Sequence, residues 1–416
     1  MNAAFSTALS GLNADSSAIN VVGSDLANLN TTGYKSSEVE FSALMSQSLG
    51  ATGSSGQVGL GVSTPIVVPQ YTQGSIQSTG GPTDAAIQGN GFFVVQGQNN
   101  QTLYTRDGAF QVNSAGQLVT ATGQNVQGWS AVNGTINPNG AVGNISVPLG
   151  ATIPATATTT MNMALNLNSQ VATTAAGATV TAPISVIDSQ GSSHTLTVTF
   201  NKTATNSWKY TVTIPATDLA TGGSTTVATG TMTFDANGNL TSPTAANDPQ
   251  VLKITGLADG ASNMSINWNL YQNGSPTITQ FAEASGVSGT TQNGYAAGQI
   301  SNVNLQNGGL LVANYSNGQQ LTVGQIAMAS IANPDSLQEV GDNNLATTAQ
   351  TATPAVGAAG TGSLGQIEAG ALESSTVDIA QEFTNLLTFQ RSYQADSRVI
   401  TTSDELMQET VNLIHP

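Results

Sequence analysis

The C-terminal segment most constrains the fold, because residues 371–415 contain neither glycine nor proline. Apolar side chains recur there at intervals of seven, the period of a helix that packs against another helix along a coiled-coil seam. Ser375 and Asp378, three residues apart, are typical of a helix start. We therefore predict an amphipathic helix of about 40 residues, roughly 60 Å long.

The N-terminus repeats this pattern, so we predict a second helix over residues 1–30. Phe5, Leu12, Ile19 and Leu26 are again seven apart, and the polar residues 30–33 end the pattern. Gly11 and Gly23 lie inside the predicted helix, where each costs about 1 kcal/mol in helix propensity. Either these glycines are tolerated small residues, or they allow a second helix to approach closely.

Two helices with the same period indicate one helical domain made of residues 1–30 and 371–416. The alternative is that both pack as ordinary surface helices on the central domain, but the length of the C-terminal helix argues against it. Each large apolar side chain gains at most about 1.5–3 kcal/mol when it is buried, and that gain is lost without a covering partner. We therefore predict self-assembly through a helix seam formed by Phe5, Leu12, Ile19, Leu26, Leu372, Ile379, Phe383, Leu386, Tyr393, Ile400, Met407 and Ile414.

The charge composition argues against nucleic-acid binding and against disorder caused by charge repulsion. The 416 residues include 7 Lys and Arg and 23 Asp and Glu, for a net charge of −16. Binding to nucleic acid needs clusters of basic residues, so we expect no nucleic-acid partner. Only 7% of the residues are charged, which is too few for disorder driven by charge repulsion.

Residue types and hydropathy argue against metal sites, membrane insertion and a cleaved signal peptide. The chain has no cysteine, so disulfides and thiolate metal sites are excluded. Its two histidines, His194 and His415, are far apart in sequence, which argues against a histidine-based metal site. No apolar run approaches the ~20 residues that span a membrane. The first positive charge is Lys35, so the basic start of a cleaved signal is missing.

The middle of the chain predicts mainly antiparallel β structure. Residues 31–83 are expected to form a linker and extended region. Asn-Gly, which favours tight hairpins, occurs eight times. A shift towards Thr, Ala and Ser predicts an outer β domain over residues 151–284, inserted into an inner β domain of residues 84–150 and 285–370. The predicted fold is thus α+β, with long coiled-coil-like terminal helices flanking nested β domains of barrel or sandwich type.

No motif predicts catalysis, so we expect no enzyme, no catalytic residue, no cofactor and no metal. Residues 360–365 match the letters of a dinucleotide fingerprint but lack the strand and helix that it requires. The run from Asp235 to Asn239 begins like a calcium loop, yet Leu240 stands where that loop needs glycine. We interpret it as a hairpin turn between Phe234 and Leu240. A pair of carboxylates for glycoside cleavage stays open, although most acids of the middle lie in turn-like sequence.

Specific strings resemble the bacterial flagellar rod and hook protein family. The first are Ala-Leu-Ser-Gly-Leu at 8–12 and Asn-Leu-Asn-Thr-Thr-Gly-Tyr-Lys at 28–35. Residues 86–95, Thr-Arg-Asp-Gly-Ala-Phe at 105–110 and Val-Gln-Gly-Trp at 126–129 resemble the next shared blocks. Residues 370–395 are similar to the family's C-terminal helix, with Thr376 where the family usually has Asn. The strings at 234–242 and 310–319 resemble hairpins typical of the hook members.

The resemblance implies a structural subunit that forms a curved, hollow tube outside the cell, the universal joint between flagellar motor and filament. Its implied partners are other hook subunits, the distal rod subunits, the hook-cap and hook–filament junction proteins, and the flagellar type III export apparatus. Export would need no cleaved signal. A distal rod-type axial protein is the alternative within the family, although rod members are shorter. A secreted adhesin would explain the Thr-rich β domains but not the matched terminal helices.

Overall fold

The chain folds into two helices and many strands, an α+β architecture in which most strand pairs are antiparallel. The computed structural model describes residues 3–44, 47–48, 57–58, 60–97 and 100–414. The helices are α1 (Ala3–Ala27) and α2 (Ile379–Ile414). The described chain divides into two compact units. Unit 1 consists of residues 1–149, 302–314 and 320–416, and unit 2 of residues 150–301 and 315–319.

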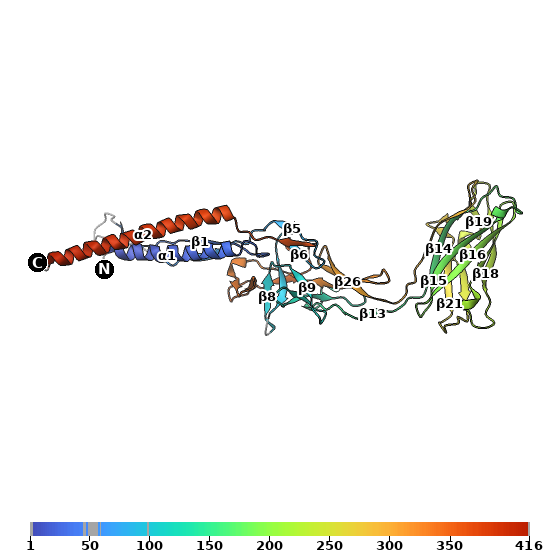
Figure 1. Ribbon diagram of the computed structural model, residues 1–416, viewed down its shortest axis with the longest axis horizontal. Helices are drawn as coiled ribbons and strands as arrows, with labels where there is room; N and C mark the ends of the chain where they lie inside the picture. Colours follow the sequence, from blue (N-terminus) through green and yellow to red (C-terminus); the bar gives the residue numbers. More distant parts are fainter. Residues whose placement is uncertain (1–2, 45–46, 49–56, 59, 98–99, 415–416) are drawn as a thin grey trace. The chain divides into compact units, whose positions relative to one another are not determined.

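In unit 1, α1 and α2 lie side by side and run in opposite directions (Figure 1). The β structure of this unit is built from short strands. They are β1 (Ser37–Glu40), β2 (Gln47–Ser48), β3 (Gln57–Val58), β4 (Ile66–Pro69), β5 (Ile76–Ser78), β6 (Ala85–Gln88), β7 (Phe92–Gln96), β8 (Thr102–Thr105), β9 (Phe110–Val112), β10 (Leu118–Thr120), β11 (Asn125–Ser130), β12 (Gly143–Asn144), β27 (Leu310–Tyr315), β28 (Gln320–Ile326), β29 (Met328–Ser330), β30 (Gln338–Glu339), β31 (Asn344–Ala346), β32 (Ala355–Gly357), β33 (Gln366–Ala369) and β34 (Ala371–Glu373), with a 3-10 helix η5 (Pro334–Ser336).

The strands of unit 1 bring distant parts of the sequence together. Strands β27, β28, β11, β7, β8, β31 and β30 follow one another in one sheet. Two further pairs, β5 with β34 and β6 with β33, join the segment after α1 to the segment before α2. Phe93 and Phe110 pack edge to face in the core, with ring centroids 5.0 Å apart. Both ends of the chain are thereby fixed to the same β structure.

Unit 2 contains two five-stranded sheets that enclose one apolar core, and one small two-stranded sheet. The strands, with those that lead into the unit, are β13 (Thr152–Ile153), β14 (Thr160–Asn166), β15 (Thr179–Ile187), β16 (Ser193–Ala204), β17 (Ser207–Thr213), β18 (Thr226–Phe234), β19 (Leu240–Ser242), β20 (Gln250–Ile254), β21 (Met264–Asn269), β22 (Tyr271–Gln272), β23 (Ser275–Pro276), β24 (Ile278–Thr279), β25 (Gly286–Gln292) and β26 (Gly298–Gln306), with 3-10 helices η2 (Ala176–Ala178), η3 (Ala216–Asp218) and η4 (Ala245–Asn247). One sheet has the order β15-β16-β17-β18-β19, and the other the order β20-β21-β14-β24 with β25 also beside β14.

Alternation along the strands of unit 2 explains this sandwich arrangement. In β14, β16 and β21 every second residue is buried, as expected for a sheet with one wet face. Tyr210 of one sheet packs edge to face on Trp268 of the other, 5.4 Å between centroids. Threonine supplies β-branched residues on the wet faces without adding charge.

Several local predictions are confirmed. At Asn133-Gly134 and Asn273-Gly274 both residues have positive φ, the geometry of the tight hairpin turns that Asn-Gly favours. Phe234 pairs with Leu240 across the turn that resembled a calcium loop.

The start of the C-terminal helix is predicted wrongly. Residues 371–373 form strand β34, so Leu372 pairs with Gln77 and is not on α2. The helix begins at Ile379, and its N-cap is Asp378, whose Oδ1 accepts the N–H groups of the next residues, Ala380 and Gln381. The Thr376 hydroxyl instead accepts the N–H of Ser36 at 2.9 Å. The β partner in a distant segment therefore overrides the helical period of these residues.

The predicted linker also forms strands. Strand β4 pairs with β1 in register from Ser37 opposite Pro69 to Glu40 opposite Ile66. Within the described residues, neither helix is long and apolar enough to cross a membrane.

Candidate assembly interface

The side of α1 that packs within the chain carries small and acidic residues. Positions three or four apart are buried, the spacing of one helix face. The buried residues of α1 are Ala8, Ala14, Asp15, Ala18, Val22 and Asp25. By contrast, Phe5, Leu12, Ile19 and Leu26 of the predicted seam are only partly buried. The large apolar stripe of α1 thus lies beside the intramolecular contact rather than inside it.

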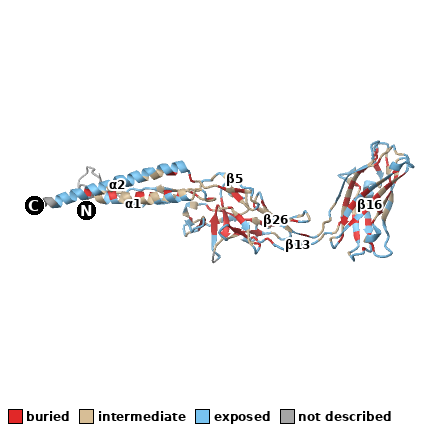
Figure 2. Cartoon of the chain, in the orientation of Figure 1, coloured by how far each residue is buried: buried red, intermediate tan, exposed pale blue. Residues whose placement is uncertain are grey.

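On α2 the large apolar side chains are mostly exposed, and Figure 2 shows the helix almost wholly in the colour of exposed residues. Leu387 and Leu406 are 56% and 61% exposed. The other exposed apolar residues of the helix are Ile379, Phe383, Tyr393, Val399, Met407 and Val411. We call these eight residues the α2 apolar surface. Of the remaining predicted seam residues, Leu386 and Ile400 are partly buried, and the side chain of Ile414 is outside the described set.

Carboxyl groups face one another across the helix pair. Asp15 lies near Asp396, and Asp25 near Glu382. Burial raises the pKa of Asp15, and the negative charge of Asp396 raises it further. Burial likewise raises the pKa of Glu382, with Asp25 adding to it. The pKa of Asp25 is raised by burial, partly offset by hydrogen bonds from Ser37 N–H and the Tyr34 hydroxyl.

These pKa shifts predict that the helix pair is more stable in mild acid. A carboxyl with a raised pKa binds its proton more tightly in the folded chain than in the unfolded one. Its stabilising effect is therefore full below the ordinary values of 3.8 for Asp15 and 4.5 for Glu382, and it is lost as the pH rises through the raised values. Circular dichroism of helix melting should give a higher midpoint at about pH 5 than at pH 7.

The double variant Asp15→Asn/Glu382→Gln is the control for this prediction, because it removes two of the titrating groups and keeps their shape. Its midpoint should change less with pH than that of the unmodified chain. An equal pH dependence in both proteins would contradict the role of these carboxyls.

The two glycines of α1 have different explanations. A Cβ on Gly11 would overlap Oδ2 of Asp396, whereas a Cβ on Gly23 would meet no atom within 4 Å. Gly11 therefore provides room for a side chain of α2, and Gly23 is a tolerated small residue. Of the two explanations that the sequence left open, close approach of a second helix applies to Gly11 and a tolerated small residue applies to Gly23.

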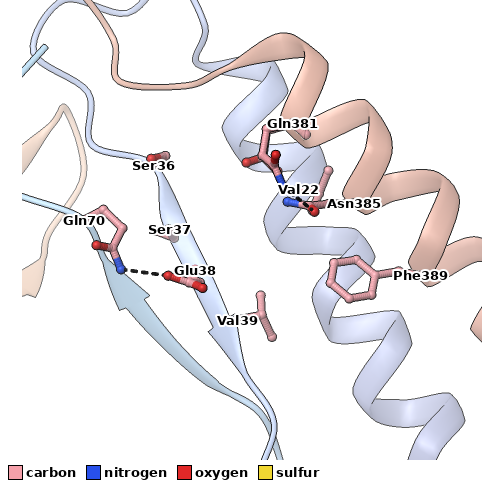
Figure 3. Close-up of a pocket in the computed structure, with 10 residues that line it drawn as sticks. Val22, Ser36, Ser37, Glu38, Val39, Gln70, Gln381, Asn385 and Phe389 are labelled. Atoms are coloured by element: carbon pink, nitrogen blue, oxygen red, sulfur yellow. Dashed lines mark hydrogen bonds between the residues drawn. The ribbon is translucent and has the colours of Figure 1, made fainter. Parts of the chain in front are cut away.

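A groove runs between α1, α2 and β1. Val22 of α1, Val39 of β1 and Phe389 of α2 line it (Figure 3). Phe389 also contacts Phe41, with ring centroids 5.9 Å apart. The segment after α1 therefore folds back along the helix pair and covers part of α2, but it leaves the α2 apolar surface open.

A buried ion cluster fixes the base of the helix pair to the β structure of unit 1. The Glu373 carboxylate is fully buried and accepts hydrogen bonds from Lys35 Nζ at 2.6 Å and Arg106 Nη1 at 3.1 Å. The N–H of Gly74 donates to the same carboxylate at 2.8 Å. Lys35 follows α1, Glu373 precedes α2 and Arg106 follows β8, so one carboxylate holds three distant segments together.

The sequence reasoning missed this cluster. In the sequence, Lys35 stands out only as the first positive charge and as the end of a string shared with the family. One signal could have found it: in a chain with seven Lys and Arg residues, each base in a strand-rich segment is a candidate for a specific partner. The partner itself, 338 residues away in the case of Lys35 and Glu373, follows only from the fold.

Uncovered apolar residues on a long helix that a buried ion cluster joins to β structure are typical of a structural subunit that other chains cover. Sequence comparisons agree with this class. Family models described as flagella basal body rod protein, flagellar hook protein FlgE/F/G D1 domain, flagellar basal body protein FlaE D2 domain and flagellar basal body rod FlgEFG protein C-terminal match residues 5–35, 86–162, 172–295 and 368–413.

Whole-length relatives identify the particular family. The flagellar hook protein FlgE of Escherichia coli is 33% identical over 99% of this chain and 100% of its own length. That of Treponema pallidum is 34% identical over 97% of this chain and 98% of its own length. A crystal structure of Helicobacter pylori flagellar hook protein FlgE2 aligns with 65% of this chain and 94% of its own, at a TM-score of 0.47 and 13% identity. The chain belongs to the flagellar hook protein family.

Proposed function

We propose that this chain assembles into the curved tube of the flagellar hook, with neighbouring subunits covering the α2 apolar surface. As a member of the hook protein family it is a structural subunit and not an enzyme. The tube acts as the universal joint that transmits motor torque to the filament. The observation that carries the proposal is the exposure of eight large apolar side chains on one helix that is otherwise anchored in unit 1.

The energetics favour assembly through the helices. Burying one large apolar side chain gains up to about 1.5–3 kcal/mol. The summed gain from burying several of them is larger than the binding free energy of a weak contact between subunits. We propose that helices of neighbouring subunits pack as a coiled coil along the twelve-residue seam predicted from the sequence. Leu372 would take part from β34, next to the helix start, because it is not on α2.

The domains are proposed to form concentric layers of the tube. The terminal helices would line the inside, with the predicted inner β domain and the predicted outer β domain forming the layers around them. The boundaries at residues 84–150 with 285–370, and at 151–284, stay predictions for these layers. With 7% charged residues, outer surfaces have few strongly directional ion pairs, which would let neighbours slide past one another as the bent tube rotates.

The partners follow from a place in the flagellum outside the cell. We propose homopolymeric contacts with other hook subunits, end contacts with distal rod subunits, and transient contacts with the hook-cap and hook–filament junction proteins. We propose passage through the flagellar type III export apparatus on the basis of membership in the hook protein family. The rod-type alternative is not favoured, since hook proteins match the chain over nearly all of its length, unit 2 included.

Electron microscopy of the purified chain under assembly conditions tests the proposal. We expect hollow tubes. The tubes should be curved if the spacing between neighbouring subunits varies around the circumference. Straight, rigid rods only would favour the rod-type function. Persistence of monomers at every concentration and salt tested would contradict self-assembly.

A further inference from the structure

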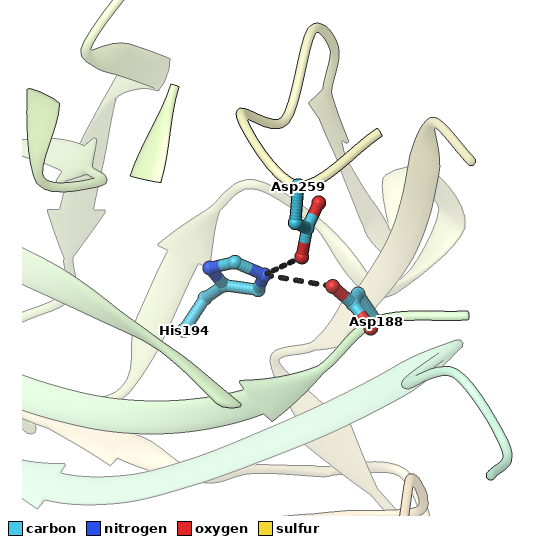
Figure 4. A group of neighbouring side chains, drawn as sticks. All are labelled: Asp188, His194 and Asp259. Atoms are coloured by element: carbon cyan, nitrogen blue, oxygen red, sulfur yellow. Dashed lines mark hydrogen bonds and ion pairs between the residues drawn. The ribbon is translucent and has the colours of Figure 1, made fainter. Parts of the chain in front are cut away.

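At one end of unit 2, three aspartates lie close to the single histidine of this unit. His194 is the second residue of β16, and Asp188 directly follows β15. Asp218 is the last residue of η3, and Asp259 lies in the turn before β21. His194 Nε2 is 3.0 Å from Asp188 Oδ2 and 3.7 Å from Asp259 Oδ2, and its Nδ1 is 3.1 Å from Asp218 Oδ2. In Figure 4 the carboxylates of Asp188 and Asp259 converge on the same ring nitrogen.

The backbone fixes Asp188 so that one of its oxygens is available. Its Oδ1 accepts the N–H groups of Gln190, Gly191 and Ser192 at 2.8, 2.8 and 3.0 Å. This turn uses up one carboxylate oxygen and points the other at His194. The Asp188 side chain is fully buried, so its orientation is set by the fold and not by solvent.

The loops that carry the other two aspartates are also held together. The Ala258 N–H donates to the Asp218 carbonyl at 3.0 Å, and the Ala220 N–H donates to the Gly256 carbonyl at 2.8 Å. Gln190 Nε2 donates to the Asp259 carbonyl at 3.3 Å. The four functional side chains are therefore positioned by backbone contacts that need no ion.

The pattern matches the ligand chemistry of zinc. A carboxylate on one histidine nitrogen fixes the tautomer and leaves the other nitrogen's lone pair for a metal, the arrangement found around many zinc ions. Here Asp218 occupies Nδ1, and Nε2 faces two further carboxylate oxygens. Ligands about 2.0–2.1 Å from a tetrahedral zinc lie roughly 3.3–3.4 Å from one another. The separations of 3.0 and 3.7 Å bracket that value.

Charge supports a cation at the same point. Three aspartates surround His194, and no lysine or arginine of the described residues forms an ion pair with any of them. The Asp188 side chain is fully buried, whereas those of Asp218 and Asp259 are 24% and 29% exposed. The charge of the buried carboxylate is the costly one unless a cation or hydrogen-bond donors compensate it. A divalent ion held by Asp188, His194 and Asp259 would compensate two of the three negative charges, while Asp259, the most exposed of the three ligands, leaves a path to solvent.

We propose that Asp188, His194 and Asp259 bind one divalent zinc-type cation, with Asp218 as the positioning residue for His194. The bound ion would tie the β15–β16 turn to the loop before β21. The sequence predicted no metal site, because its two histidines are far apart and only a second histidine was considered as a further ligand. The carboxylate ligand Asp259 is 65 residues further along the chain than His194, and only the fold brings it near.

Equilibrium dialysis of the unassembled full chain against ZnCl₂ tests the proposal, followed by cobalt substitution and absorption spectroscopy. We expect one Zn²⁺ per chain and, with Co²⁺, the intense visible bands of a four-coordinate ion. Asp259→Asn should weaken binding more than about 10-fold without unfolding, since this residue is exposed. Asp218→Asn should weaken it about 10- to 100-fold by releasing the histidine ring.

Two matched variants control for other ligands. Glu283→Gln removes an exposed acid of unit 2 outside the cluster, and His415→Gln removes the second histidine; both should retain full binding. Equal zinc affinity in Asp259→Asn and the unmodified chain would overturn the proposal, as would the absence of any ion bound at about 100 µM zinc. In that case both ring nitrogens of His194 donate to carboxylates and the cluster is a purely internal hydrogen-bond network.

Discussion

Glu373→Gln is expected to destabilise unit 1 by roughly 3–5 kcal/mol, the cost of breaking a buried ion pair. The substitution keeps the size of the side chain but removes its charge, and it leaves Lys35 and Arg106 buried without a counterion. The two cations lie on one carboxylate whose side chain is fully buried, and both are less than one-tenth exposed themselves. Since water cannot reach them, solvation does not replace the lost interaction.

Denaturant unfolding, followed by helix signal and by tryptophan fluorescence, measures this effect. The helix signal reports on unit 1. Trp129 is also buried in unit 1, so all proteins are compared in a Trp129→Phe background, where Trp208 and Trp268 report on the core of unit 2. The first transition should then move and the second should not. Glu368→Gln is the matched control, because Glu368 is exposed on β33 only five residues away. A shift of less than about 1 kcal/mol in Glu373→Gln, as in a surface ion pair, would contradict the role of the cluster.

A triple variant distinguishes breaking the cluster from removing it. Lys35→Met, Arg106→Met and Glu373→Leu together leave no buried charge, and such replacements are often neutral or stabilising. We expect this protein to recover much of the stability that Glu373→Gln loses. The cluster would then matter chiefly because it specifies which segments meet.

Leu387→Asp is expected to abolish tube formation while leaving the monomer folded. Leu387 is 56% exposed in the single chain, so a polar side chain there costs the monomer little. In an assembled tube the same position would be covered, and a carboxylate would have to be buried without a partner. The loss of contact adds up to about 1.5–3 kcal/mol for each subunit, repeated at every interface of the polymer.

Sedimentation of the assembly reaction and electron microscopy of the pellet measure this effect, with circular dichroism of the supernatant as the test of folding. Leu387→Met, which keeps an apolar side chain of similar volume, should assemble normally. Tubes of normal yield from Leu387→Asp would show that this part of α2 stays outside the interface. The proposal would then have to move to another face of the helix.

The helices were predictable because their signal is local. Seven-residue spacing and the absence of glycine and proline are properties of consecutive residues, and they located α1 and most of α2. The start of α2 was missed, since residues 371–373 have a β5 partner that the periodicity of one segment cannot reveal. The Asn-Gly hairpin turns at Asn133 and Asn273 were predictable for the same reason as the helices, because a tight turn is decided by two residues.

The packed face of α1 was not predictable in the same way. The sequence directs attention to Phe5, Leu12, Ile19 and Leu26, yet within the chain the buried positions are small or acidic residues one helical step away, such as Ala18 and Asp25. The seven-residue period identifies a stripe of apolar residues on the helix, but it does not identify the element that packs against that stripe. Which stripe contacts α2 depends on how the strands on either side orient the two helices.

By itself, the sequence determined the α+β class, the two terminal helices, the β middle with its uncharged polar surface, and the family, since each rests on neighbouring residues or on matching strings. Only the tertiary structure decided that Glu373 unites Lys35 and Arg106, that the α2 apolar surface stays open, and that His194 meets Asp188, Asp218 and Asp259. The physical reason is that buried charges and ligand sets are made by residues far apart in the chain, and folding alone brings them within 4 Å.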